Sequence, residues 1–239
     1  MASIAINGLG RIGRAALKIA LGIGGIDVVA VNDLVPADNL AYLLRYDTVY
    51  GRNGRPVTAR GDSLIVAGHP VRVLACGDPA ALPWADLGVD LVLECTGAFR
   101  REENLSKHLA ASARFVILSD PARAETVATV VHGVNQAPAG QQMISCASCT
   151  TSCITPVAEV MSRRIGVRQA VMTTVHAYTS SQQLTDGRPA TFGGAGPAPP
   201  TWCPPPPARP PRPPGRCRAW PGRSPTSCSP PPGPPAAAR

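Results

Sequence analysis

The sequence has 239 residues and a formal net charge of +8, but the charge is unevenly distributed. Up to residue 187, 16 Lys and Arg accompany 15 Asp and Glu, whereas residues 188–239 hold seven Arg, no acidic residue and 19 of the 27 prolines. The positive charge therefore gives no support to nucleic-acid binding, and no apolar run reaches the length that spans a membrane. Because residues 188–239 also lack Leu, Ile and Val, we expect this tail to be disordered.

The eight cysteines show no secreted disulfide framework, and no signal-peptide pattern opens the chain. We therefore expect a cytoplasmic protein. Cys146 and Cys149 form a C-x-x-C pair, which leaves a redox or zinc site as an alternative. No second pair or nearby histidine completes such a site, so we expect no metal.

The chain begins with a predicted buried strand at residues 3–7, followed by G-x-G-x-x-G at residues 8–13 and an amphipathic run at 14–21. This order is typical of a dinucleotide-binding turn. Gly8 permits the tight turn, Gly10 lets a pyrophosphate approach the backbone, and Gly13 lets the helix pack on the strand. Arg11 and Ile12 would offer N–H groups of the helix start to the phosphates.

A second strand is predicted at residues 27–31 and ends in Asn32 and Asp33, twenty residues past Gly13. A carboxylate at this place accepts hydrogen bonds from a ribose 2′-hydroxyl and repels a 2′-phosphate. The pattern therefore predicts NAD rather than NADP as the cofactor.

In the middle of the chain, the spacing of apolar residues predicts helices at 37–46 and 103–111 and strands at 90–95 and 114–119. Alternation of apolar and polar residues predicts antiparallel strands within 57–74. Thr96 and Gly97 follow a strand and fall on the cofactor side of the sheet. Trp84 is interpreted as a core residue, Glu94 as a packing or turn residue, and His108 as a solvated residue on a polar helix face.

Cys149 lies where a short apolar run at 143–145 gives way to helical apolar spacing from 150 to 166. The N–H groups and dipole of a helix start lower the pKa of a thiol and favour the reactive thiolate. A strand predicted at 169–178 would carry His176 to its end, where the imidazole could serve as a base for Cys149.

Two motifs resemble phosphorylating glyceraldehyde-3-phosphate dehydrogenase: Ala-Ser-Cys-Thr-Thr-Ser-Cys at 147–153, with Ser152 where the family has Asn, and Thr-Thr-Val-His-Ala-Tyr-Thr at 173–179. The resemblance runs from Ser3 to about residue 187. It implies a Rossmann-type α/β fold with a mostly parallel sheet and helices on both faces at 1–148, a truncated α+β catalytic domain at 149–187, and an unrelated tail at 188–239.

The resemblance also implies a reaction. Cys149 attacks the aldehyde of glyceraldehyde 3-phosphate, His176 takes the hydroxyl proton as hydride passes to NAD, and inorganic phosphate releases an acyl phosphate from the thioester. By the same resemblance Ser119 lies near the nicotinamide, and the substrate and phosphate oxygens are held by Ser148, Thr150 and Thr179. The family is homotetrameric, and it usually has Ala where this chain has Asp120.

The end of the resemblance suggests that the reading frame slips near Arg188, since a shifted frame of the tail is compatible with the family's continuation. Three alternatives to an active enzyme of this class stay open. They are a catalytically inactive NAD-binding fragment, an erythrose-4-phosphate dehydrogenase, and an interaction protein whose Pro/Arg tail binds a polyproline-reading domain.

Overall fold

The computed structural model describes residues 1–177 and 179. The chain divides into two units, Met1–Thr174 and Val175–Arg239. The first unit holds all the helices and strands of the described residues. The tail from residue 188, for which we expect disorder, lies outside the described residues.

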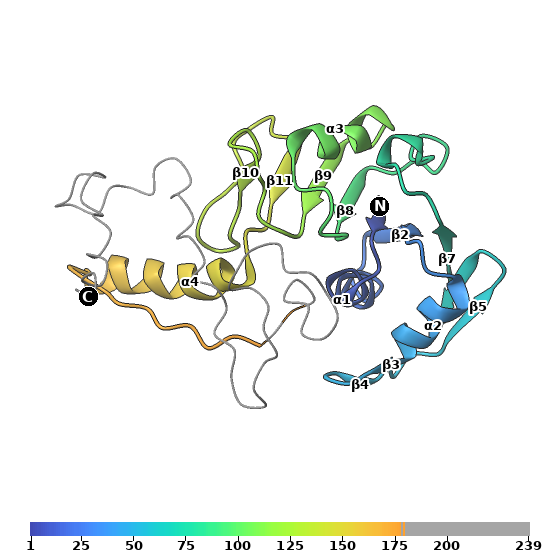
Figure 1. Ribbon diagram of the computed structural model, residues 1–239, viewed down its shortest axis with the longest axis horizontal. Coiled ribbons are helices and arrows are strands. Elements are labelled where there is room, and N and C mark those ends of the chain that lie inside the picture. The colour runs from blue at the N-terminus through green and yellow to red at the C-terminus, as the bar shows by residue number, and fades with distance from the viewer. Residues whose placement is uncertain (178, 180–239) are drawn as a thin grey trace, which may run out of the picture. The chain divides into compact units, whose positions relative to one another are not determined.

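A nine-stranded sheet forms the centre of the first unit (Figure 1). Its strand order is β10 (Ala128–Thr129), β11 (Met143–Ser145), β9 (Phe115–Leu118), β8 (Leu91–Glu94), β1 (Ala2–Asn7), β2 (Ile26–Asn32), β7 (His69–Leu74), β6 (Ser63–Val66) and β5 (Val57–Arg60). Strands from β10 to β7 pair in parallel, while β5, β6 and β7 pair antiparallel. The predicted α/β class and the antiparallel insertion at 57–74 are both confirmed.

The other elements are a small hairpin and the helices. The hairpin pairs β3 (Tyr46–Asp47) with β4 (Gly51–Arg52). The helices are α1 (Arg11–Ala20), α2 (Ala37–Arg45), the 3₁₀ turn η1 (Pro79–Ala81), α3 (Glu102–Ala110) and α4 (Cys149–Arg164).

Helices cover both faces of the sheet because successive strand residues point to opposite sides. On one face, Ile4 and Ile6 of β1 pack with the buried side chains of α1 and α2. On the other face, Ala5 packs with Val92 and Trp84, and Leu105 of α3 packs on Val116. This two-sided burial leaves the ends of the parallel strands as the place where a ligand can reach the sheet.

The carboxyl ends of the parallel strands are in register. Asn7 pairs with Asn32 on one side and with Glu94 on the other. Glu94 pairs with Leu118, which in turn pairs with Ser145. The loops that leave these strands therefore all start from one edge, with β1 at the point where the strand order reverses.

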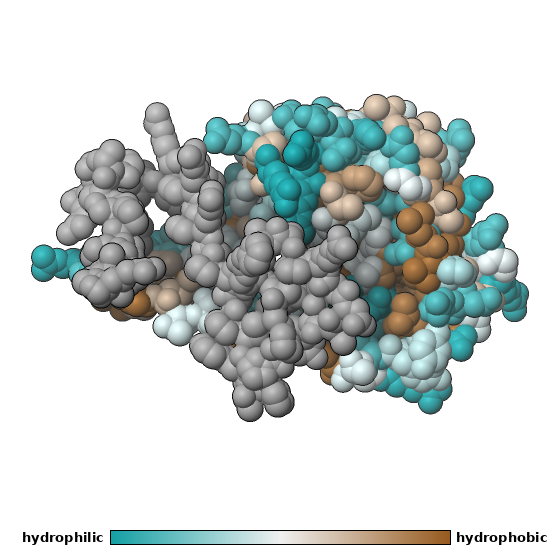
Figure 2. Space-filling view, in the orientation of Figure 1, coloured by the Kyte–Doolittle hydropathy of each residue, from teal (hydrophilic) through white to brown (hydrophobic). Residues whose placement is uncertain are grey.

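Helix α4 contrasts with the rest of the first unit because none of its sixteen residues is buried. Its apolar side chains keep large exposed fractions, including 55% for Val157 and 52% for Val160. Figure 2 shows some brown and tan surface at the left, in the area where Figure 1 draws α4 and the segment that follows it. A helix of this kind gains little stability from tertiary packing.

The close packing of α1 on β1 gives a first prediction. A Cβ at Gly13 would lie 2.0 Å from the carbonyl oxygen of Gly8, whereas a Cβ at Gly10 would meet no atom of a described residue within 4 Å outside its own helix and chain neighbours. Gly13→Ala should therefore lower the free energy of unfolding by at least about 2 kcal/mol through overpacking. Gly10→Ala should stay within about 1 kcal/mol of the wild type.

Urea unfolding of the two variants checks this prediction. Equal losses in both would mean that glycine is needed here for chain flexibility and not for close approach.

Candidate functional site

The glycine-rich turn is held between two neighbouring loops. Gly8 has φ +89°, and a Cβ there would lie 2.7 Å from the backbone nitrogen of Thr96. On the other side, the N–H of Leu9 donates to Oδ2 of Asp33 at 2.7 Å. The backbone conformation and the contact with Thr96 both require glycine at position 8.

The start of α1 fits a dinucleotide. Gly10 is the N-cap residue and has no side-chain cap among the described residues, and Gly10, Arg11 and Ile12 are exposed. Among residues 1–177 and 179, outside its chain neighbours and its own helix, nothing lies within 4 Å of where a Gly10 Cβ would be. N–H groups of a first helical turn attract phosphate oxygens, so this opening suits a pyrophosphate.

Asp33 also fits the role predicted for it. Its half-buried carboxylate accepts from the N–H groups of Leu9 and Val35, the latter at 3.0 Å. A carboxylate has about four acceptor positions, so two stay available to ribose hydroxyls. The neighbouring Asn32 is 5% exposed and its amide bonds to Asn7 and Cys76. A contact between Asn32 and the cofactor stays a prediction.

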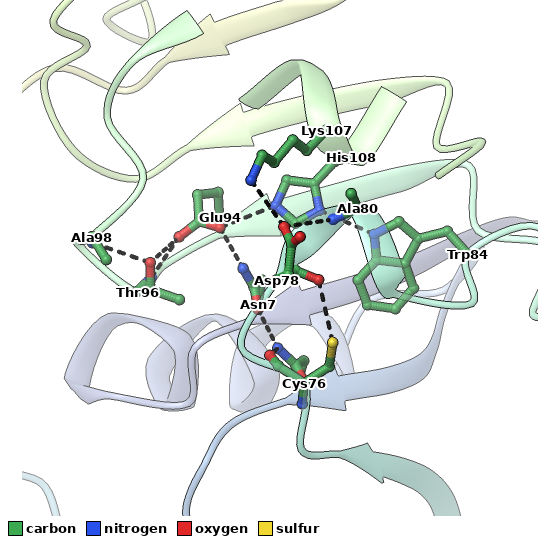
Figure 3. Close-up of polar contacts among 11 residues, drawn as sticks. Asn7, Cys76, Asp78, Ala80, Trp84, Glu94, Thr96, Ala98, Lys107 and His108 are labelled. Carbon is green, nitrogen blue, oxygen red and sulfur yellow. Dashed lines mark hydrogen bonds and ion pairs between the residues drawn. The ribbon is translucent and has the colours of Figure 1, made fainter. Parts of the chain in front are cut away.

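A buried polar cluster lies beneath the glycine turn (Figure 3). Glu94 and His108 are both 0% exposed, and Nε2 of His108 lies 3.1 Å from Oε2 of Glu94. Trp84 Nε1 donates to Nδ1 of His108 at 3.0 Å. Core burial of Trp84 is confirmed.

The expectation that His108 is solvated is wrong. The helix turns His108 inward beside Leu105, and hydrogen bonds to both ring nitrogens compensate for its burial. The sequence did contain a signal, since a carboxylate at the end of an apolar strand needs buried donors.

Glu94 also fixes the turn after β8. Its Oε1 accepts from the N–H of Thr96 at 2.8 Å and from the Thr96 hydroxyl. The N–H of Ala98 donates to that same hydroxyl oxygen at 3.1 Å, and Gly97 between them has φ +73°. Thr96 is thereby held next to Gly8, and Gly97 follows it in the same turn. Contact of Thr96 and Gly97 with a cofactor stays a prediction.

The loops after β8 and β9 are joined by an ion pair. Arg100 Nη2 lies 2.6 Å from Oδ2 of Asp120, and both side chains are about one-third exposed or less. Burial raises the pKa of Asp120, while the nearby Arg100 and Arg123 guanidinium groups act in the opposite direction. Ser119, at the end of β9, donates its N–H to the carbonyl of Glu94 at 3.0 Å.

Cys149 is the first residue of α4 and is exposed. Ser148 caps this helix, since its Oγ accepts from the N–H of Thr151 at 3.0 Å. Thr150 follows in the first turn and is half-buried. Ala147 has φ +64°, an unfavourable conformation for a residue with a Cβ. The chain thus makes a sharp turn between β11 and α4 that leaves the thiol at a helix start, as predicted.

His176 and Thr179 belong to the second unit, whereas Cys149 belongs to the first. The pairing of Cys149 with His176 stays a prediction. The strand expected at 169–178 is wrong for residues 169–177, which adopt no regular secondary structure. A strand forms only by pairing with a neighbour, and no strand of the described residues pairs with this segment.

Other thiols near the strand ends are poor nucleophiles. Burial raises the pKa of Cys95 to about 11, against a smaller opposing effect of a hydrogen bond with Ser119. The pKa of Cys146 is also raised, by the partial burial of its thiol in an otherwise exposed residue. Within residues 1–177 and 179, no group of three or more acidic, His or Cys side chains could hold a metal ion. No helix of that part is long and apolar enough to cross a bilayer.

Comparison with known proteins identifies this arrangement. Residues 2–102 match the model of the glyceraldehyde 3-phosphate dehydrogenase NAD binding domain, and residues 148–198 match that of the C-terminal domain of the same enzyme. The chain belongs to the glyceraldehyde-3-phosphate dehydrogenase family. The cofactor of the matched N-terminal domain is NAD, as predicted, and the match to the C-terminal domain continues beyond residue 187.

Relatives in this family come from several bacteria. The chain is 46% identical over 189 residues to glyceraldehyde-3-phosphate dehydrogenase 1 of Bacillus cereus, covering 78% of the chain and 56% of that protein. It is 47% identical over 186 residues to glyceraldehyde-3-phosphate dehydrogenase of Geobacillus stearothermophilus, covering 77% of the chain and 55% of that protein. The chain spans about half the length of the curated relatives it matches.

The Asp120 ion pair gives a prediction for pH dependence. Because burial raises its pKa above 3.8, the folded state keeps the Asp120 proton to higher pH than the unfolded state does. The stabilising effect of this group is complete below pH 3.8 and is lost as pH rises through its raised pKa. Asp120→Asn should therefore gain stability relative to the wild type as pH rises from acid to neutral.

Asp90→Asn is the control with the opposite sign. Hydrogen bonds from the Ser3 N–H and from Arg114 lower the pKa of Asp90, so its stabilising effect is lost as pH falls. This variant should lose stability relative to the wild type as pH rises. Urea unfolding across the acid range measures both slopes, and slopes of the same sign would contradict the assigned environments.

Proposed function

We propose that residues 1–148 bind NAD and that Cys149 and His176 perform the NAD-dependent oxidative phosphorylation of glyceraldehyde 3-phosphate to 1,3-bisphosphoglycerate. One observation carries the cofactor part: the uncapped, open start of α1 at Gly10 lies beside the Asp33 carboxylate, which is fixed by the N–H of Leu9. The proposal assigns the pyrophosphate to the N–H groups near Gly10 and the ribose to Asp33.

The chain's own residues supply the other steps. His176 takes the proton of the Cys149 thiol, the thiolate adds to the aldehyde carbon, and the proton returns to the oxygen to give a thiohemiacetal. Neutral His176 then accepts this hydroxyl proton again as hydride leaves the carbon. When bound, NAD supplies the acceptor for the hydride that leaves this carbon. Inorganic phosphate then attacks the resulting Cys149 thioester, and the sulfur leaves as thiolate. The backbone N–H of Cys149, at the start of α4, would stabilise the oxyanion.

The proposed surroundings follow from the same resemblance. Ser148, Thr150 and Thr179 would hold substrate and phosphate oxygens, and Thr96, Gly97 and Ser119 would line the cofactor. A cytoplasmic location would keep Cys149 reduced. The family's homotetramer is the expected assembly of the complete enzyme.

A second candidate function is NAD binding without turnover. The observation that favours it is the packing of α4, which carries Cys149 but buries none of its residues. Catalysis needs reacting groups held in a defined geometry, and a helix without tertiary packing gives no such restraint.

Calorimetric titration with NAD and an assay of NADH formation separate these candidates. Turnover of glyceraldehyde 3-phosphate that needs phosphate and disappears in Cys149→Ser supports the first. NAD binding with no turnover supports the second. Faster turnover of erythrose 4-phosphate would assign the chain to the related dehydrogenase.

The glycine at the open helix start gives a specific prediction. Gly10→Ala places a methyl group where the pyrophosphate should lie, so NAD affinity should fall by about tenfold or more, equal to about 1.4 kcal/mol. Gly24→Ala is the matched control, because a Cβ at Gly24 also meets nothing within 4 Å but lies in the loop between α1 and β2. Calorimetry on both variants measures the difference, and equal affinities would refute the assignment of Gly10.

A further inference from the structure

Glu94 is a buried carboxylate whose hydrogen bonds are all taken by the protein. It accepts from Nδ2 of Asn7 at 2.5 Å, from Nε2 of His108 at 3.1 Å, and from both the N–H and the hydroxyl of Thr96. A carboxylate has about four acceptor positions, so these donors fill them. Loss of any donor leaves part of a fully buried charge without compensation.

The contact with Trp84 determines the protonation of His108. An indole N–H can only donate, and it donates to Nδ1 of His108 at 3.0 Å. Nδ1 must therefore carry the lone pair, and the ring proton must be on Nε2, where it points to Glu94. An imidazolium would place two N–H groups against each other. The geometry thus selects the neutral Nε2–H tautomer.

This cluster ends on the residues that surround the glycine turn. Through Oε1, Glu94 holds Thr96, whose backbone nitrogen lies 2.7 Å from where a Gly8 Cβ would be. Through Oε2 it holds Asn7, whose Oδ1 accepts from Asn32 at 2.7 Å. A movement of the Glu94 carboxylate would therefore be transmitted to the loops after β8, β1 and β2.

We propose that His108 is a positioning residue for the cofactor edge, acting through Glu94 to fix Thr96 against the glycine turn. The proposal rests on the proposed binding of NAD by residues 1–148. His108 is a buried residue of α3, and its two ring nitrogens form hydrogen bonds with Trp84 and Glu94. Its effect on NAD is therefore indirect and depends on donating one hydrogen bond in one orientation.

Variants of the full chain test this role by NAD calorimetry and thermal unfolding. His108→Leu removes the donor and should weaken NAD binding by about tenfold. His108→Gln should restore affinity to within about threefold of the wild type, because its amide can donate to Glu94 and accept from Trp84.

Leu105→Ala is the matched control on the same helix face. Leu105 is also 0% exposed but packs in an apolar cluster. The Leu105→Ala variant should have a lower melting temperature, while its NAD affinity should change by less than about twofold. NAD affinity that falls only in proportion to the melting temperature across all three variants would overturn the positioning role.

Nitrogen-15 NMR of the wild-type imidazole gives a second test that needs no variant to fold. His108 should show a protonated Nε2 and an unprotonated Nδ1. The opposite tautomer, or an imidazolium at neutral pH, would overturn the proposal.

The outcomes also separate this inference from the proposed function. A wild-type chain that fails to bind NAD overturns both. A wild-type chain that binds NAD as tightly as its His108→Leu variant overturns the role of His108 alone.

Discussion

The cofactor edge depends on one fully buried carboxylate. Placing a charge in a protein interior is unfavourable unless hydrogen bonds replace its hydration. Glu94 meets this requirement with donors from β1, from α3 and from the turn that follows β8. The need to satisfy one charge therefore fixes three segments that are far apart in the sequence. The glycine turn is built on that fixed base.

The glycine turn itself shows how space and charge are divided at this edge. Backbone atoms already occupy the space where side chains at Gly8 and Gly13 would lie. A Cβ at Gly8 would clash with Thr96, and a Cβ at Gly13 would clash with Gly8. Gly10 stands at the positive end of α1, and within the described part of the chain a Cβ there would meet nothing. Asp33 supplies negative charge at the neighbouring strand end and is anchored by the Leu9 N–H. The protein thus offers N–H donors for phosphate oxygens and a carboxylate acceptor for ribose hydroxyls. This arrangement is complementary to a dinucleotide.

Sequence patterns predicted the elements whose formation depends on residues that are close together in the chain. The strand, glycine turn, helix and acid at 3–33 could be predicted because each step depends on residues close in sequence. His108 could not, because its burial depends on Trp84 and Glu94, which precede it by 24 and 14 residues. The Arg100–Asp120 pair was missed for the same reason. The strand predicted at 169–178 shows the reverse error over residues 169–177. Apolar, β-branched residues favour a strand, but no neighbour among the described strands pairs with them.

The two halves of the proposed activity depend on different sources of stability. The edge formed by Asn7, Asn32 and Glu94 is supported by a core packed on both faces of the sheet. Cys149 begins a helix whose apolar residues stay largely exposed. The Ser148 cap and the turn at Ala147 help to fix its position. Cofactor binding needs only the first source, whereas thioester chemistry needs both the thiol and the base held in place. NAD affinity can therefore be retained in a chain that turns over little substrate, and the packing of α4 is the physical quantity that decides between these states.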